Sequence, residues 1–276
     1  MKYAFLLILF AVTTIVVSVF FIYKNQTTQL KANLIYVFQH AFLHQSESNA
    51  IHSTVRIRDG DETFCVSGTQ EDTELIQEVV YSISNALNLS WSIIAREELQ
   101  FCPHEQVSIY VYTDDFVNKS KLINFFDSAE IPRPPDDIDF FSIPNTKGFT
   151  SQIPNGTSLA FIRNKQETEE SHYQSVVIEE LLQVILDADD VATDTLISII
   201  AEDHSVADEY SRWFEKNPLG LCVIDLMLLE ILLNPNHKHL QYYNQVYSYI
   251  RSNFVELRSN AHKLAAKLNH LRDNRC

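Results

Sequence analysis

The chain has 276 residues, a formal net charge of −15 and 46% hydrophobic residues. This length and composition are those of a globular protein with one substantial core. The acidic balance argues against a nucleic-acid partner, because phosphate binding requires a basic surface. With only five Gly, the chain also has no Gly-rich phosphate-binding loop.

The first predicted element is an apolar run without charge, Gly or Pro at residues 4–22. About 20 apolar residues suffice to cross a bilayer as a helix, so residues 1–24 are predicted to be a signal anchor with the membrane as its partner. Bulky residues occupy the place of a cleavage site, and no Cys follows for lipidation. The chain is therefore expected to be a single-pass membrane protein with an extracytoplasmic domain, in the periplasm or cell envelope.

Residues 25–50 are predicted to form a juxtamembrane helix. Within it, Leu30, Leu34, Val37 and Ala41 recur at helical spacing over 28–45. We expect this helix to pair with the C-terminal part of the chain and to hold the anchor against the domain.

Residues 51–236 predict an α+β domain. Alternating apolar residues indicate strands at 54–58, 106–112 and 158–163. Apolar periodicity indicates helices at 71–89, 168–187, 193–202 and 221–233. Residues 131–157, rich in Pro, are typical of a long surface loop, and a short edge strand is expected near Phe140. Two cysteines, Cys65 and Cys102, are either a disulfide in an oxidising compartment or two small buried side chains.

Residues 237–276 predict a basic helix with apolar residues at steps of three and four. The seam consists of Leu240, Tyr243, Tyr247, Ile250, Phe254, Leu257, Ala261, Leu264, Leu268 and Leu271. A sustained heptad pattern is typical of a coiled coil or of one long docked helix. Two interpretations stay open: a homo-oligomer formed through 240–271, or a helix that packs into the core of its own chain.

The predicted helix at 168–187 combines an almost fully apolar circumference with a single polar stripe. The stripe contains His172, Ser175, Glu179, Glu180, Gln183 and Asp187. If the stripe faces water, the helix is an ordinary amphipathic surface helix. If it is buried, its carboxylates need partners, and the stripe lines a cleft or an internal polar network.

The stripe also carries the spacing of a metallopeptidase helix. In His-Glu-x-x-His, two His four residues apart bind zinc, and the intervening Glu activates a water molecule. Glu180 occupies the catalytic position, while Glu179 and Gln183 occupy the two ligand positions. Because a neutral amide is a poor zinc ligand, no metal or other cofactor is expected. If a metal binds at all, Glu179 and Gln183 would hold it.

The segment from Val177 to about Pro235 resembles an uncharacterised family of proteobacterial envelope proteins, many of them lipoprotein-like. Members carry Glu-Glu-x-x-Gln in place of His-Glu-x-x-His, which Glu179, Glu180 and Gln183 match. The segments Leu186-Asp-Ala-Asp-Asp190 and Leu221-Cys-Val-Ile-Asp225 also resemble the family. The Gly-containing turn that often follows the Gln is missing here.

The resemblance implies a zincin-like fold: a small mixed sheet backed by two long helices, then a helical C-terminal part. In zincins the edge strand beside the cleft binds extended substrate. The function expected first is a catalytically degenerate pseudo-peptidase, with Glu180 in the catalytic position and a binding stripe of Glu179, Gln183, Asp187 and His172, that binds a protein or peptide.

Two alternatives remain open. One is an active metal-dependent hydrolase that uses zinc, Glu179, Glu180 and a distant ligand, for which the candidates are Asp187, Asp189, Glu202 and His204. The other is a structural or assembly protein that oligomerises through the C-terminal helix.

Overall fold

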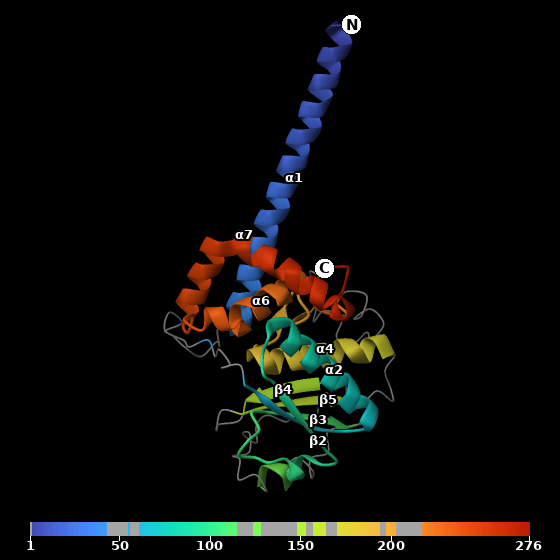
Figure 1. Cartoon of the computed structure of the whole chain (residues 1–276), viewed down its shortest axis with the longest axis vertical. Helices are drawn as coiled ribbons and strands as arrows, with labels where there is room; N and C mark the ends of the chain where they lie inside the picture. The colour runs from blue at the N-terminus through green and yellow to red at the C-terminus, as the bar shows by residue number, and fades with distance from the viewer. Residues whose placement is uncertain are drawn as a thin grey trace.

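The computed structural model describes residues 2–42, 55, 61–114, 124–127, 148–152, 157–163, 170–193, 197–202 and 217–276. These form an α+β fold in which one mixed sheet lies against a group of helices (Figure 1). The α+β class predicted from the sequence is confirmed.

The main sheet has five strands in the order β2-β1-β3-β5-β4. The strands are β1 (Thr63–Ser67), β2 (Ser92–Arg96), β3 (Ile109–Asp114), β4 (Gly148–Gln152) and β5 (Ser158–Arg163). Strands β2, β1, β3 and β5 run parallel to one another. Strand β4 pairs with β5 in the antiparallel direction and forms the edge of the sheet.

Both faces of the central strands are buried, as is usual for parallel sheets. Alternate residues such as Phe64, Val111 and Ile162 join the large core beneath the helices. The residues between them, among them Cys65 and Tyr110, join a smaller cluster on the other face. A disulfide between Cys65 and Cys102 ties that second layer to β1, which confirms the pairing among the alternatives that the sequence left open.

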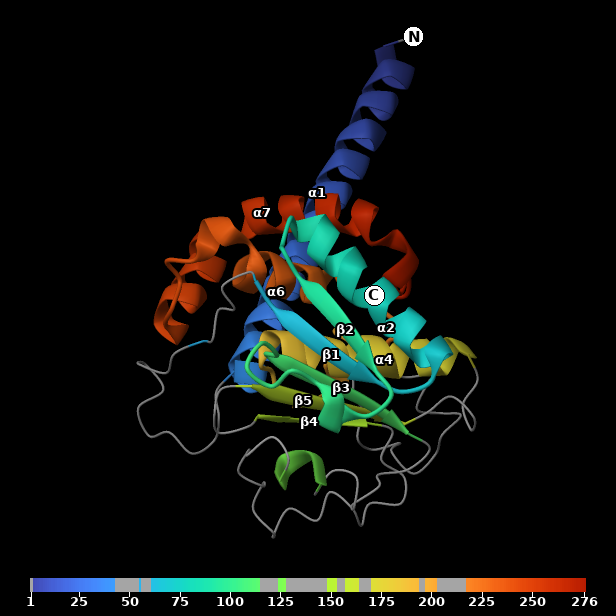
Figure 2. The same cartoon turned by 60° about the horizontal axis from the view of Figure 1, so that its bottom comes forward.

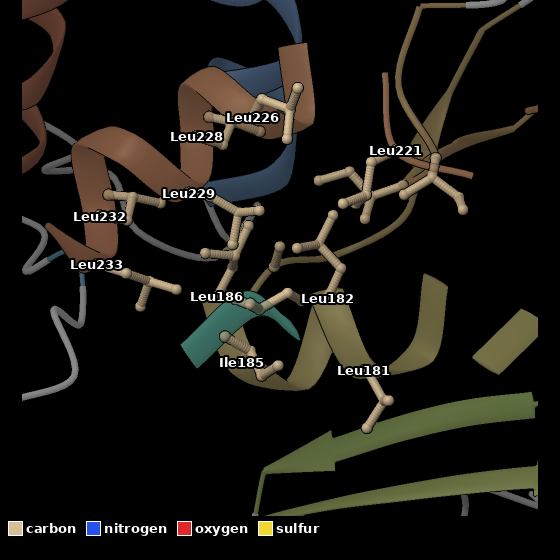
Figure 3. Packing of buried hydrophobic residues seen from close by; sticks show 14 of the residues in the cluster. Leu181, Leu182, Ile185, Leu186, Leu221, Leu226, Leu228, Leu229, Leu232 and Leu233 are labelled. Carbon is tan, nitrogen blue, oxygen red and sulfur yellow. The ribbon is translucent and has the colours of Figure 1, made fainter. Parts of the chain in front are cut away.

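Two long helices cover one face of the sheet, as predicted. They are α2 (Gln70–Leu87) and α4 (Glu170–Leu186). Thr69 caps α2 by accepting from the Asp72 amide, a favourable N-terminal arrangement. Helix α4 contacts β4 and β5 on one side and α2 and α6 (Val223–Leu233) on the others. Figure 3 shows Leu181 pointing toward the sheet and Leu182 pointing toward Leu221.

Helix α1 (Lys2–Phe42) is a single helix that extends away from the rest of the molecule (Figure 1). The predicted membrane-spanning helix at residues 4–22 is contradicted: none of the helices, over the described residues, has an apolar stretch sufficient to cross a bilayer. Instead of standing as a separate segment, the run at residues 4–22 continues without a break to Phe42, and the second half of the same helix packs in the core.

The C-terminal half of α1 belongs to the core. Its side chains Leu34, Val37 and Phe38 are fully buried. The Phe38 ring stacks on Tyr243 of α7 (Tyr243–Lys267) with 5.0 Å between centroids. On the flank, the Lys31 ammonium donates to the Arg251 carbonyl at 2.7 Å. The expected pairing between the segment 28–45 and the C-terminal region is therefore present, although the helix ends at Phe42.

The C-terminal seam lies inside this one chain. Ile250, Phe254, Leu257 and Leu264 are buried in the large core, and α7 contacts α6, α1 and α2. Non-helical backbone angles at Asn253 bend the helix, and Figure 2 shows it curving over the other helices. This packing supports the core interpretation of the heptad pattern, while oligomerisation stays a prediction.

The start of α6 depends on one fully buried carboxylate. Asp225 Oδ2 accepts from the amides of Cys222, at 2.7 Å, and Ile199, at 3.0 Å. Ser198 donates its hydroxyl hydrogen to Oδ1. A second disulfide, Cys222–Cys276, attaches the end of the chain to the same place. Asp225 thereby joins the segment before α6 to the core.

Several local predictions need correction. The helix predicted at 193–202 is wrong: β6 (Val191–Ala192) and β7 (Ala201–Glu202) form a short parallel pair there. Three strands of the main sheet, β1, β2 and β4, are not predicted by the sequence pattern. Of the strand predicted at 54–58, only Val55 is described, and the expected edge strand near Phe140 lies outside the described residues.

We expect Phe38→Ala to lower the free energy of unfolding by about 3–5 kcal/mol, because it opens a cavity between α1 and α7. The matched control is Val255→Ala on α7, whose side chain is 78% exposed and should change stability by less than about 0.5 kcal/mol. Urea unfolding measures both. Equal effects would contradict a structural role for α1.

A second expectation concerns pH. Burial raises the pKa of Asp225 to about 6, against about 3.9 in an unfolded chain. Between these values only the folded state holds the proton. The stabilisation from this group is therefore complete below about pH 4 and is lost as the pH rises through about 6.

The stability of the wild type minus that of Asp225→Asn should fall by roughly 3 kcal/mol between about pH 4 and pH 7, at about 1.4 kcal/mol per unit of pKa. Asp61→Asn, at an exposed position, serves as control and should give no such slope. Parallel pH profiles for the wild type and Asp225→Asn would refute this expectation.

Candidate functional site

The polar stripe of α4 is buried. Ser175, Glu179, Glu180 and Gln183 are each at most 6% exposed. An amphipathic helix with its stripe in water is therefore the wrong interpretation, and the stripe belongs to the interior beside the sheet. Burying two adjacent carboxylates is costly unless polar neighbours compensate, so the surroundings of this stripe are specialised.

Glu180 lies directly against the edge strand. A methyl group added at Gly148, the first residue of β4, would stand 2.3 Å from Oε1 of Glu180 and 2.5 Å from its Cδ. A side chain at position 148 would therefore require the Glu180 side chain to shift. The carboxylate in the catalytic position of the motif is thus held at the start of the antiparallel edge strand.

Gln183 is occupied by an internal hydrogen bond. Its Nε2 donates to Oδ1 of Asp190, in the loop that follows α4. Gln183 and Asp187 also line a pocket of about 60 Å³ together with Thr150 of β4 and Ser158 of β5. This pocket has room for water, but a ligand pocket usually has about 300 Å³ or more.

The loop after α4 is fixed to α1. Asp187 has a positive φ of 61°, so it takes the left-handed conformation for which Gly is the usual residue. The Asp189 amide donates to the Ala41 carbonyl at 3.0 Å, and the Tyr36 hydroxyl donates to the Ala192 carbonyl at 2.8 Å. Asp187 thereby supplies the turn that leads from α4 into the loop held against α1.

The remaining predicted site residues are only partly brought together. His172 lies near the start of α4 and is half-buried, with its carbonyl accepting from the Ser175 hydroxyl at 2.7 Å. The side chain of Glu202 and the whole of His204 lie outside the described residues. Among the described residues, no cluster of three His, Cys, Asp or Glu is close enough to hold a metal ion.

Sequence reasoning missed a further buried carboxylate, which lies beside this helix on α2. Asp72 of α2 is 1% exposed. It accepts from Tyr173 at 2.6 Å, Thr69 at 2.6 Å and Thr113 at 3.2 Å. Burial, and then the hydrogen bond to Asp72, raise the pKa of Tyr173. These contacts join α2, β3 and α4, and the Thr69-x-x-Asp72 capping pattern was the available sequence signal.

Comparison with known proteins adds no relative: no family model, no curated protein and no solved structure matches this chain. The resemblance drawn from the Glu-Glu-x-x-Gln motif therefore stays an expectation. The function has to be argued from the geometry around α4 and β4.

The contact between Gly148 and Glu180 gives a specific expectation. Gly148→Ala should destabilise the fold by about 1–3 kcal/mol, as overpacking of a close contact does. In the Glu180→Ala background the added methyl has room, and the same change should cost less by at least about 0.5 kcal/mol. A double-mutant cycle by denaturant unfolding measures this coupling. Additive effects would show that the two residues do not press on each other.

Proposed function

We propose that this protein is a zincin-like domain without hydrolytic machinery that binds an extended segment of a protein or peptide along β4. The observation that carries the proposal is the different surroundings of two residues in the Glu-Glu-x-x-Gln motif. Glu180 lies against the edge strand, whereas Gln183 takes the position of a zinc ligand but is bonded to Asp190.

The chemistry of Gln183 favours binding over hydrolysis. A zinc ligand at this position would have to offer an imidazole, thiolate or carboxylate. Gln183 offers a neutral amide, and its amide nitrogen already donates to Asp190. Activation of a metal-bound water by Glu180 would need a metal that this position holds poorly.

The sheet edge supplies a peptide-binding surface of a known kind. β4 is last in the sheet order and pairs only with β5 in the described part of the chain. An extended peptide can add to such an edge through main-chain hydrogen bonds. Because the pocket beside Gln183 is small, a segment lying along the strand fits this region better than a buried small molecule.

The two disulfides support an extracytoplasmic location. Cys65–Cys102 joins β1 to the layer below it, and Cys222–Cys276 joins α6 to the end of the chain. Disulfides persist in oxidising compartments such as the periplasm and are rare in the cytosol. The binding partner is thus expected to be an envelope or secreted protein.

Amide hydrogen exchange with casein, an unstructured protein, as the probe tests the proposal. We expect casein to slow exchange in β4 (148–152) and not in β2 (92–96), which is the opposite edge of the same sheet and serves as the internal control. No change, or equal protection at both edges, contradicts binding at β4.

A parallel assay separates binding from hydrolysis. Casein incubated with the protein and zinc should stay intact, with the wild type and Glu180→Ala giving the same result. Zinc-dependent cleavage that disappears in Glu180→Ala would overturn the proposal and favour the active metal-dependent hydrolase.

A further inference from the structure

A cavity of about 380 Å³ lies at a place that the α4 site does not use. It forms where the C-terminal ends of α2 and α6 meet the second half of α7, a junction visible in Figure 2. None of its lining residues belongs to α4 or β4. Its volume falls within the usual range for ligand pockets, about 300–1,000 Å³.

A buried carboxylate and two amides form the inner part of this cavity. Glu230 of α6 is 7% exposed. Its Oε1 accepts from Asn234 Nδ2 at 2.9 Å and from Asn260 Nδ2 at 3.1 Å. The His237 ring lies 3.9 Å from the same oxygen, and burial lowers the pKa of that ring. The inner wall is therefore preorganised, and within the described part of the chain no Lys or Arg forms a salt bridge with Glu230.

The outer rim carries the opposite charge. Lys263 and Lys267 are exposed on α7 and line the cavity. Lys263 donates to the Asn260 Oδ1 at 3.3 Å, which connects the rim to the inner amides. Lys267 donates to the Ala86 carbonyl near the end of α2 at 2.7 Å, as is favourable at a helix C-terminus. Anionic groups are attracted to the rim and repelled from the inner wall.

This arrangement favours a ligand that has hydroxyl groups at one end and an anionic group at the other. A phosphate or other compact anion in the inner part of the cavity would lie beside the Glu230 carboxylate. Its own negative charge would have no cationic partner there. Hydroxyl groups donate as well as accept, and they suit Glu230 and the amides of Asn88, Asn234 and Asn236 that line the cavity. A carboxylate on the same molecule suits the lysines.

We propose that the cavity binds an acidic saccharide, with hydroxyl groups at Glu230 and the amides and the carboxylate at Lys263 and Lys267. This site is independent of the peptide-binding function proposed for β4, because the two share no residue.

Calorimetric titration of the full chain with D-glucuronate tests the site, with D-glucose, acetate and L-glutamate as comparison ligands. We expect saturable binding of glucuronate, with glucose and acetate each weaker by about tenfold or more, the effect of losing roughly one charge-assisted contact. No saturable binding of glucuronate overturns the proposal. Tighter binding of glutamate also overturns it and assigns the cavity to amino acids.

Two single variants locate the binding. Lys263→Ala should weaken glucuronate about tenfold, whereas Lys238→Ala, also exposed but outside the cavity, should leave it unchanged. Far-UV circular dichroism verifies that both variants are folded. Equal affinity in the two variants would place glucuronate elsewhere and overturn the assignment to this cavity.

Discussion

An α-helix that is apolar around most of its circumference is stable only where protein covers it on all sides, and α4 is that helix here. The sheet covers one side, α2 and α6 cover others, and its apolar residues from Val176 to Leu186 are buried in the large core. Leu186 on α4 and Leu229 on α6, which lie in the same core and on facing helices in Figure 3, are part of this enclosure. Helices α1 and α7 pack in turn against α6, and α7 also contacts α2. The architecture can thus be understood as the set of elements that a fully buried central helix requires.

The same constraint explains the chemistry beside the edge strand. Glu179, Glu180 and Gln183 are shielded from water once α4 is enclosed, and buried polar groups need partners in the protein. Gln183 donates to Asp190, and the side chain of Glu180 lies close to Gly148. The turn after α4 is in turn held by α1 through the Ala41 carbonyl. Helix α1, whose N-terminal part extends away from the domain, therefore also fixes the loop after α4. That loop contains Asp190, the hydrogen-bond partner of Gln183.

The sequence patterns predicted best those helices and strands whose apolar residues recur at a regular spacing. Strand β5 was predicted with the residues it has, and α2, α4 and α6 lie close to their expected ranges, because their apolar spacing matches their burial. The segment at 193–202 was assigned wrongly because the periodicity of a short apolar run such as Leu196 to Ile200 does not distinguish a helix from a strand. Tertiary contacts decide otherwise: Asp225, 26 residues later, accepts the Ile199 amide. Helix α1 differs from the expectation because the apolar run at 4–22 continues into a segment that packs in the core of the domain.

Only part of the candidate site could be predicted from the sequence, and the reason is physical. The identity and spacing of Glu179, Glu180 and Gln183 follow from one helix, so the sequence displays them. Their neighbours come from elsewhere: Gly148 lies more than thirty residues before Glu180, and the cavity of Glu230 combines three helices. The spacing of residues within one helix or strand cannot reveal contacts between segments that are distant in the sequence. A chain with five Gly nevertheless carries a hint, because Gly costs conformational entropy and is retained where backbone and side chain approach closely. Gly148 beside Glu180, Gly68 beside Thr113 and Gly220 beside the Leu271 carbonyl are three such approaches, and in each the chain brings distant segments together at a place where a methyl group would not fit.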